Sequence, residues 1–379
     1  MADSDYKNYD ISSIVGHKKQ LEFLNAIFAG NRMPSGLLFF GQKNIGKKFT
    51  AVVFAASVLC SDYKAFSGKN DDRLLNFCGK CPSCVSLLNG ASQNFMTVEP
   101  SGSAIKIESI HKINSFLSLT SAYPGYRFII IDEASSMNAS AANALLKMLE
   151  EPVGKTIFIL VTSNPGILLP TVVSRCLLLG FSPVPDEFLL NVFKTEFPDI
   201  KTETLELYAK LSRGSYSGFM GLIEGGYLEK RNFLIRTIFK ELFMEYQNKN
   251  IYKNFYEISA KFNLFEKEAA TARRKEKNLN SNENSASKAE ENYDKGYVFE
   301  LILFILRDIY IYKVSKNEKL LYNEDIADEI KEFALDSALS SKDIGHMIEL
   351  TVEYLEKINS YNLNKSIAAD SYFSNLLSL

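Results

Sequence analysis

A glycine-bearing segment near the N-terminal end has the residue types and spacing of a phosphate-binding loop. It runs Gly41-Gln42-Lys43-Asn44-Ile45-Gly46-Lys47, follows a short apolar run and opens a helical pattern. Glycines such as Gly41 and Gly46 let backbone N–H groups curl around phosphate oxygens at a helix N-terminus, and Lys47 would add a point charge. The same pattern also fits a strand-to-helix turn that binds nothing.

Position 48 departs from the pattern of such a loop. The motif requires Ser or Thr there to place a hydroxyl on Mg²⁺, and this chain has Lys48. Thr50 follows two residues later, about 200° around the helix, and cannot easily substitute. We therefore expect the loop fold to be kept and productive Mg-ATP hydrolysis to be lost. Phosphate binding has separate requirements, so a loop that holds ATP through Lys47 and one that does not both remain open.

Two acidic residues, Asp132 and Glu133, follow a second apolar run. In phosphate-loop proteins an acid pair at this place holds Mg²⁺ and polarises the attacking water. Carboxylates at the end of a strand are common without catalysis. The pair therefore indicates a nucleotide site only in combination with the loop at 41–47.

Four of the five cysteines are crowded into one short stretch, as Cys60, Cys78, Cys81 and Cys84. Two-residue spacers let successive thiolates converge on one ion, and four sulfurs in a tetrahedron suit Zn²⁺. An iron–sulfur cluster would be expected to show a Pro after the last Cys and a second ligand set, and a lone dithiol leaves two cysteines unexplained. We predict a closed, structural zinc site, with Cys176 outside it as a small buried side chain.

These residues need a parallel sheet to position them. Unbroken apolar runs at 37–40, 128–131 and 157–161 read as buried strands, and helical patterns cover 47–60 and 140–150. Alternation of this kind is typical of an α/β domain whose parallel sheet is covered on both faces.

Helical periodicity replaces the strand signals after about residue 181. We divide the chain into an α/β domain at 1–180, with the zinc module at about 60–84, a small helical domain at 181–228 and an all-α domain at 229–379. Within the last, 266–295 is rich in Lys, Glu, Asn and Ser, which predicts a mobile insertion between two helices or frayed extensions of them.

Charge and hydropathy exclude several classes of protein. Lys and Arg number 43 against 45 Asp and Glu, so the chain does not coat nucleic acid by charge alone. The most apolar stretch, 298–312, is interrupted by charges and too short to span a bilayer, so we read it as a core helix. The polar N-terminus lacks a signal-peptide pattern, and we expect a cytoplasmic protein that has no membrane contact.

With these motifs the chain resembles the clamp-loader branch of the AAA+ ATPases over about residues 10–228. Besides the loop and the cysteines, the resemblance rests on four further segments: Ile14-Val15-Gly16-His17, Asp132-Glu133-Ala134, Ala142-Asn143-Ala144-Leu145-Leu146-Lys147-Met148-Leu149-Glu150-Glu151-Pro152, and Ser174-Arg175-Cys176. The resemblance implies an AAA+ α/β base, a helical lid and a helical collar that joins a five-subunit ring.

The resemblance also implies roles for single residues. Arg175 would be an arginine finger that reaches the ATP site of a neighbouring subunit, and Ser163 falls at the first sensor position. The second sensor is normally an Arg, and here that position is Ser217. The chain therefore lacks two elements of an active ATPase, the hydroxyl at position 48 and the sensor Arg at position 217.

Both losses favour a stator subunit over a self-sufficient motor. By resemblance its partners would be gamma/tau and delta subunits in a heteropentamer, with the sliding clamp and primed DNA reached through the assembly. Two alternatives remain. One is an active motor ATPase of the gamma/tau kind in which Lys48 is tolerated. The other is a zinc-bearing nucleic-acid-binding module, which the few basic residues of the cysteine segment disfavour.

Overall fold

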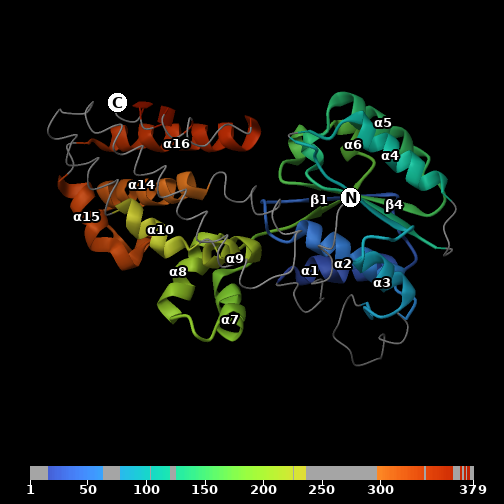
Figure 1. Cartoon of the computed structure of the whole chain (residues 1–379), viewed down its shortest axis with the longest axis horizontal. Coiled ribbons are helices and arrows are strands. Elements are labelled where there is room, and N and C mark those ends of the chain that lie inside the picture. Colours follow the sequence, from blue (N-terminus) through green and yellow to red (C-terminus); the bar gives the residue numbers. More distant parts are fainter. Residues whose placement is uncertain are drawn as a thin grey trace, which may run out of the picture. The chain divides into compact units, whose positions relative to one another are not determined.

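The structure, a computed structural model, places most of the chain in two compact units, Met1–Phe219 and Met220–Leu379 (Figure 1). It describes residues 16–62, 77–102, 104–119, 125–224, 226–235, 297–336, 339–361, 368, 371–372 and 374–375. The predicted insertion at 266–295 lies outside these residues. The three-domain division at 180 and 228 stays a prediction, and each unit is described by itself below.

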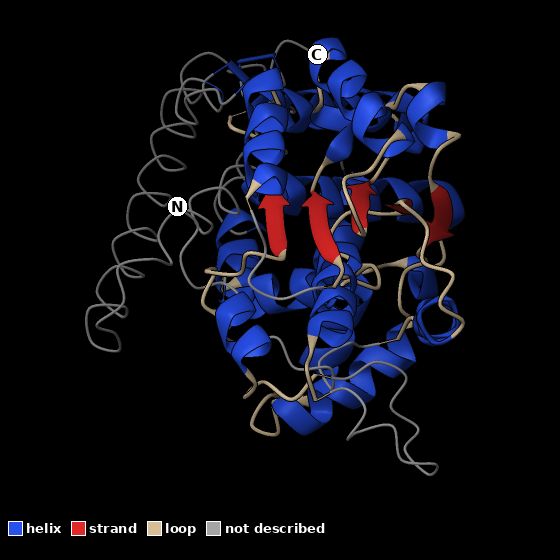
Figure 2. Cartoon of the chain, turned by 90° about the vertical axis from the view of Figure 1, so that its right-hand side faces the viewer, coloured by secondary structure: helices blue, strands red, loops and turns tan. Residues whose placement is uncertain are grey.

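A five-stranded parallel sheet forms the centre of the first unit, in the order β2-β3-β4-β1-β5 (Figure 2). Its strands are β1 (Gly36–Phe40), β2 (Phe95–Val98), β3 (Arg127–Ile131), β4 (Thr156–Thr162) and β5 (Leu177–Gly180). The three apolar runs predicted as strands are β1, β3 and β4, and nearly all of their residues are buried. The prediction of a parallel α/β sheet is confirmed.

The sequence did not predict β2 and β5. Each is four residues long, and β5 lies at an edge of the sheet, where Leu177 and Leu178 remain 41% and 51% exposed. Short edge strands carry little burial pattern of their own. Their strand conformation comes from pairing with β3 and β1, which local sequence does not report.

Helices cover both faces of the sheet. On one face lie α1 (Lys18–Ala29), α2 (Lys47–Leu59) and α3 (Pro82–Leu88), and on the other lie α4 (Ile107–Ser118), α5 (Ala139–Glu150) and α6 (Pro170–Val173) (Figure 1). Short 3-10 turns follow β3 and β4 at Ala134–Ser136 and Pro165–Ile167. The almost entirely buried α2 anchors the loop before it, since Phe54 packs edge-on against Phe128 of β3.

A helical segment follows β5. It contains α7 (Asp186–Glu196), α8 (Thr202–Ser212) and α9 (Tyr216–Glu224). Phe219 of α9 is fully buried, stacked on Phe193 and met edge-on by Tyr208. This aromatic cluster holds the start of α9 against α7 and α8, and so positions the residues that precede Phe219.

The second unit is helical throughout its described residues. It contains α10 (Tyr227–Phe233), α14 (Tyr297–Ser315), α15 (Ala327–Asp336) and α16 (Ser341–Tyr361), with 3-10 turns at Glu318–Leu320 and Glu324–Ile326. The apolar stretch predicted as a core helix is α14, which packs against both α15 and α16. None of the helices described here is long and apolar enough to cross a membrane.

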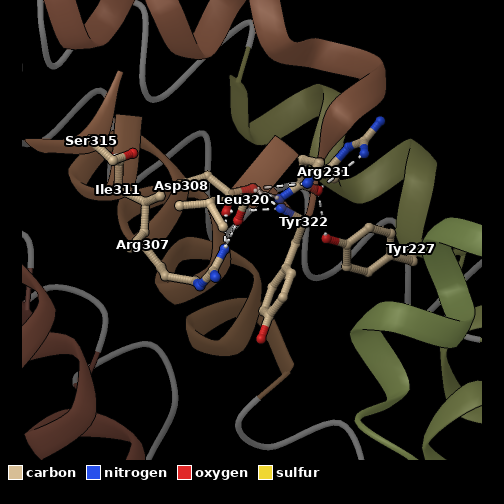
Figure 3. Close-up of polar contacts among 9 residues, drawn as sticks. Tyr227, Arg231, Arg307, Asp308, Ile311, Ser315, Leu320 and Tyr322 are labelled. Atoms are coloured by element: carbon tan, nitrogen blue, oxygen red, sulfur yellow. Dashed lines mark hydrogen bonds and ion pairs between the residues drawn. The ribbon is translucent and has the colours of Figure 1, made fainter. Parts of the chain in front are cut away.

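A buried carboxylate holds the turn after α14 in place (Figure 3). Asp308 is fully buried, and Oδ2 accepts hydrogen bonds from Tyr322 N at 3.1 Å and Asn323 N at 2.8 Å. The guanidinium of Arg307 bonds the same carboxylate and lies 3.6 Å over the Tyr322 ring. Asn323 in turn accepts from Tyr227 of α10 and from the buried Arg231. A polar network therefore joins α10, α14 and the turn.

We expect Asp308→Ala to lower the free energy of unfolding by about 3–5 kcal/mol, because it leaves the backbone N–H groups of Tyr322 and Asn323 without their acceptor and removes the ion pair with Arg307. Urea denaturation of the full chain measures this. The matched control is Asp328→Ala, whose side chain is 94% exposed and should change stability by less than about 0.5 kcal/mol. Equal effects of the two substitutions would contradict the role given to Asp308.

Candidate functional site

The parallel sheet brings the predicted site residues to one edge. Gly41 follows β1, Asp132 follows β3 and Ser163 follows β4, and the register pairs Phe40 with Thr162 and Ile131 with Leu160. Because all strands run in the same direction, these loops leave the sheet at its carboxyl edge, where open α/β sheets bind ligands. Glu99, which the sequence analysis missed, follows β2 at this edge as well.

Both motif glycines of the loop between β1 and α2 have positive φ. Gly41 has φ 145°, and a Cβ there would lie 2.3 Å from the carbonyl oxygen of Phe181. Gly46, the N-cap of α2, has φ 90°, and Asn44 has φ 61°. Positive φ at Gly41 and Gly46 is a conformation that L side chains rarely adopt, so the two glycines are required by the turn itself.

Lys47 points back into this loop. It is 6% exposed, and its ammonium donates to the carbonyl oxygens of Gly41, at 2.8 Å, and Gln42. Burial lowers the pKa of Lys47, and the nearby carboxylates of Glu133 and Asp132 act in the opposite direction. The ammonium therefore lies inside the curl of the loop, as a phosphate-binding lysine must.

Polar groups from outside the loop also bond its backbone. His17 Nε2 donates to the carbonyl oxygen of Ile45 at 2.6 Å, and its ring lies edge-on to Phe181. Ser217, at the position where the resemblance predicts a sensor Arg, donates to the carbonyl oxygen of Asn44 at 3.0 Å, and Ser215 donates to the same atom. The sequence analysis did not assign contacts to His17 and Ser215, since no local pattern marks these long-range bonds.

The residues present do not fit Mg²⁺. The Lys48 ammonium forms ion pairs with Glu99 and with Asp132 Oδ2, the latter at 3.5 Å. The Thr50 hydroxyl is fully buried and donates to the carbonyl oxygen of Gly46 at 2.9 Å. Thus no hydroxyl is offered at position 48, and the acid expected to hold the metal already has a cation. This agrees with the expected loss of Mg-ATP hydrolysis.

The four clustered cysteines do fit Zn²⁺. The Sγ atoms of Cys60, Cys78, Cys81 and Cys84 all lie within 4.8 Å of one another. The Cys60–Cys81 and Cys78–Cys84 separations are each 4.0 Å, close to the edge of about 3.8 Å of a tetrahedron with Zn–S bonds of ~2.3 Å. Cys176 lies apart, buried in the apolar core of the other sheet face, as predicted.

Backbone N–H groups surround these sulfurs in the way that thiolates require. The N–H groups of Cys78 and Cys84 approach Cys60 Sγ and Cys81 Sγ at 3.4 Å each, and that of Cys81 approaches Cys78 Sγ at 3.2 Å. Burial opposes ionisation of Cys81, but the backbone N–H groups of Cys84 and Ser61, together with the thiols of Cys84 and Cys78, outweigh it and lower the pKa of Cys81 to about 6. Burial raises the pKa of Cys60 and Cys84. A bound divalent ion would offset that cost, because it stabilises thiolates.

Arg175 lies on the surface just after α6. Its Nη2 is 2.5 Å from Glu150 Oε1 and its Nη1 donates to the carbonyl oxygen of Thr171 at 3.0 Å. The guanidinium is thus held by α5 and α6 of its own chain, and no described contact joins it to the loop at 41–47. Ser163 is half-buried at the end of β4. The roles of these two residues remain predictions.

Comparisons with known proteins agree with the resemblance to clamp-loader proteins that the sequence motifs indicate. Residues 16–185 match the family described as "DNA polymerase III, delta subunit". "DNA polymerase III subunit delta'" of Pseudomonas aeruginosa is 32% identical over 208 residues, 54% of this chain and 60% of that protein. The Bacillus subtilis protein of the same name is 26% identical over 334 residues, 88% of each chain. "DNA polymerase III subunit tau" of Bacillus subtilis is 25% identical over 56% of this chain and 36% of its own length. The match to the Pseudomonas relative thus spans less than two thirds of that protein.

The cysteine cluster predicts one zinc per chain, measured by elemental analysis of the purified protein. Cys81→Ala should lose the metal, because three thiolates leave the tetrahedron open. The matched control is Cys176→Ala, which removes a cysteine outside the cluster and should retain one zinc. Iron in place of zinc, or full zinc content in Cys81→Ala, would refute the assignment.

His17 predicts a pH dependence of stability. Burial lowers its pKa from 6.5, so below about pH 6.5 the unfolded chain binds the proton more readily and stability falls with falling pH. His17→Gln should therefore lose less stability than the wild type between pH 7 and pH 5. The exposed His111 on α4 provides the control, since His111→Gln should keep the wild-type slope. Urea midpoints at each pH measure the slopes, and parallel curves for His17→Gln and wild type would exclude this effect.

Proposed function

We propose that this chain, whose residues 16–185 match the family described as "DNA polymerase III, delta subunit" and which is similar to delta-prime subunits, is a stator subunit of a bacterial clamp loader. It would complete the ATP site of a neighbouring subunit and so help to load the sliding clamp onto primed DNA during replication. It would have no polymerase chemistry of its own, and would work in the cytoplasm with the replisome.

The ion pair between Lys48 and Asp132 is the observation that carries this proposal. A motor subunit needs a hydroxyl at position 48 and a free carboxylate at 132 to hold the metal of Mg-ATP. This chain lacks the first and has neutralised the second. Ser217 stands in the sensor position and bonds the loop instead of reaching a phosphate. The phosphate loop then serves as structure, and the chain contributes to catalysis elsewhere.

We assign that contribution to Arg175. Its guanidinium is exposed, follows the short helix α6 and is held by two acceptors, Glu150 and the Thr171 carbonyl. A planar guanidinium can exchange a surface carboxylate for a phosphate oxygen with the same paired donors, and there it would stabilise charge on the transferring phosphoryl group. The exposed ion pair to Glu150 is weak enough to be exchanged.

Partners follow from the same proposal. The subunits that would receive the arginine and complete a heteropentamer are gamma/tau and delta, and DNA and the clamp would be reached through the assembly. The retained Lys47, Asp132 and Glu133 favour a second candidate, a motor ATPase of the gamma/tau kind, and tau of Bacillus subtilis is indeed similar over 56% of this chain. The two candidates differ in whether the isolated chain turns over ATP.

We expect Arg175→Ala to leave assembly with gamma/tau and delta intact and to lower ATP hydrolysis at the affected site by a factor on the order of 10³. Steady-state turnover of the reconstituted complex, with DNA and clamp present, measures this. Arg175→Lys should stay defective because it keeps the charge and loses the paired donors. Arg32→Ala, at an exposed arginine after α1, serves as the matched control.

Wild-type turnover of an Arg175→Ala complex would exclude the finger. If the isolated chain hydrolysed ATP at about 1 s⁻¹ or faster, and lost this on Lys47→Ala, the motor candidate would replace the stator.

A further inference from the structure

Lys48 is held at the carboxyl edge of the sheet by two carboxylates from different strands. It is the second residue of α2, and its ammonium bonds Glu99, after β2, and lies 3.5 Å from Asp132 Oδ2, after β3. The side chains of Lys48, Glu99 and Asp132 are 31%, 52% and 22% exposed. Partly exposed ion pairs of this kind add little to stability. The pairing therefore matters less for the stability of the fold than for cation binding, because it decides which cation lies beside these carboxylates.

The Lys48 side chain disfavours a metal site in two ways. Mg²⁺ requires nearly octahedral oxygen ligands at ~2.0–2.1 Å and binds through one or two carboxylates. At position 48 the oxygen ligand of the motif is replaced by an ammonium, which offers no lone pair. The same ammonium lies against Asp132 Oδ2, so a divalent ion there would meet a fixed positive charge at close range.

The rest of the loop offers no substitute hydroxyl among its described residues. The Thr50 hydroxyl is fully buried and donates to the Gly46 carbonyl. Asp132 Oδ1 accepts from the backbone N–H of Glu133 at 3.0 Å, and Oδ2 is the oxygen that faces Lys48. A cation that binds Oδ2 must therefore compete with Lys48.

We propose that Lys48 acts as a tethered cation that takes the place of the divalent metal and prevents this phosphate loop from binding Mg²⁺. The Lys48 ammonium is a fixed part of the chain and supplies one positive charge to the two carboxylates of Glu99 and Asp132, whereas a metal ion would come and go with nucleotide. Lys48 is then the residue that decides the metal specificity of the site. This proposal deepens the proposed function and rests on the same ion pair between Lys48 and Asp132, but it holds whether or not Arg175 is a finger.

The test uses Mn²⁺ as a spectroscopic probe for Mg²⁺ on the zinc-loaded full chain, with and without ATP. After subtraction of the Mn²⁺ that ATP binds in protein-free solution, electron paramagnetic resonance of free Mn²⁺ should show no saturable site on the wild type below about 1 mM. Lys48→Thr restores the hydroxyl and frees Oδ2, and in the presence of ATP it should bind one Mn²⁺ at least about tenfold more tightly than the wild type. Adding Asp132→Asn to Lys48→Thr should abolish that site.

Two controls keep the outcome interpretable. Lys112→Thr makes the same substitution at an exposed lysine of α4 and should behave as the wild type. Lys48→Ser provides a second hydroxyl variant in case Lys48→Thr fails to fold, with zinc content and circular dichroism as checks. A saturable Mn²⁺ site on the wild type that Asp132→Asn removes would overturn the proposal, and so would folded hydroxyl variants that bind Mn²⁺ no better than the wild type. The Arg175 experiment is unaffected by either result.

Discussion

The parallel pairing of β1, β3 and β4 decides where the charged groups of the candidate site must lie. All strands end at the same edge, so Glu99, Asp132 and Glu133 gather there beside two lysines that begin α2. Like charges brought this close are tolerated only when each finds a partner. In a nucleotide-hydrolysing loop a metal ion and phosphates supply that balance for part of each cycle. Here the chain supplies it from its own side chains.

Because of this internal balance, polar groups of the loop find their partners within the same chain. The Lys47 ammonium is bonded to the loop's own carbonyl oxygens, and Ser217 and His17 bond the carbonyl oxygens of Asn44 and Ile45. Each of these contacts joins a different part of the first unit to the loop: α2, the start of α9 and the residue before α1. The loop therefore connects these three elements to one another, which suits the stator role proposed above.

Much of this could be predicted from the sequence, and the failures have a common cause. The buried strands β1, β3 and β4, the loop and the cluster of four cysteines carry local patterns of apolar residues, glycines or cysteines, and these were found. The strands β2 and β5 and the residue Glu99 were missed, because four-residue strands take their conformation from neighbours far along the chain. The replacement of a motif hydroxyl by Lys48 was visible at once. The contact of its ammonium with two carboxylates could not be predicted, because it depends on the parallel sheet, which brings Glu99 and Asp132 together.

The cysteine cluster has a consequence for how the chain folds. Its four sulfurs lie within one short stretch of sequence that ends at Cys84, whereas β4, the first partner of β1 to be synthesised, begins only at Thr156. A nascent chain can therefore capture zinc before the central sheet exists. Since Cys60 directly follows α2 and Cys84 lies within α3, the metal would join these helices early and give the growing chain a template against which the later strands assemble.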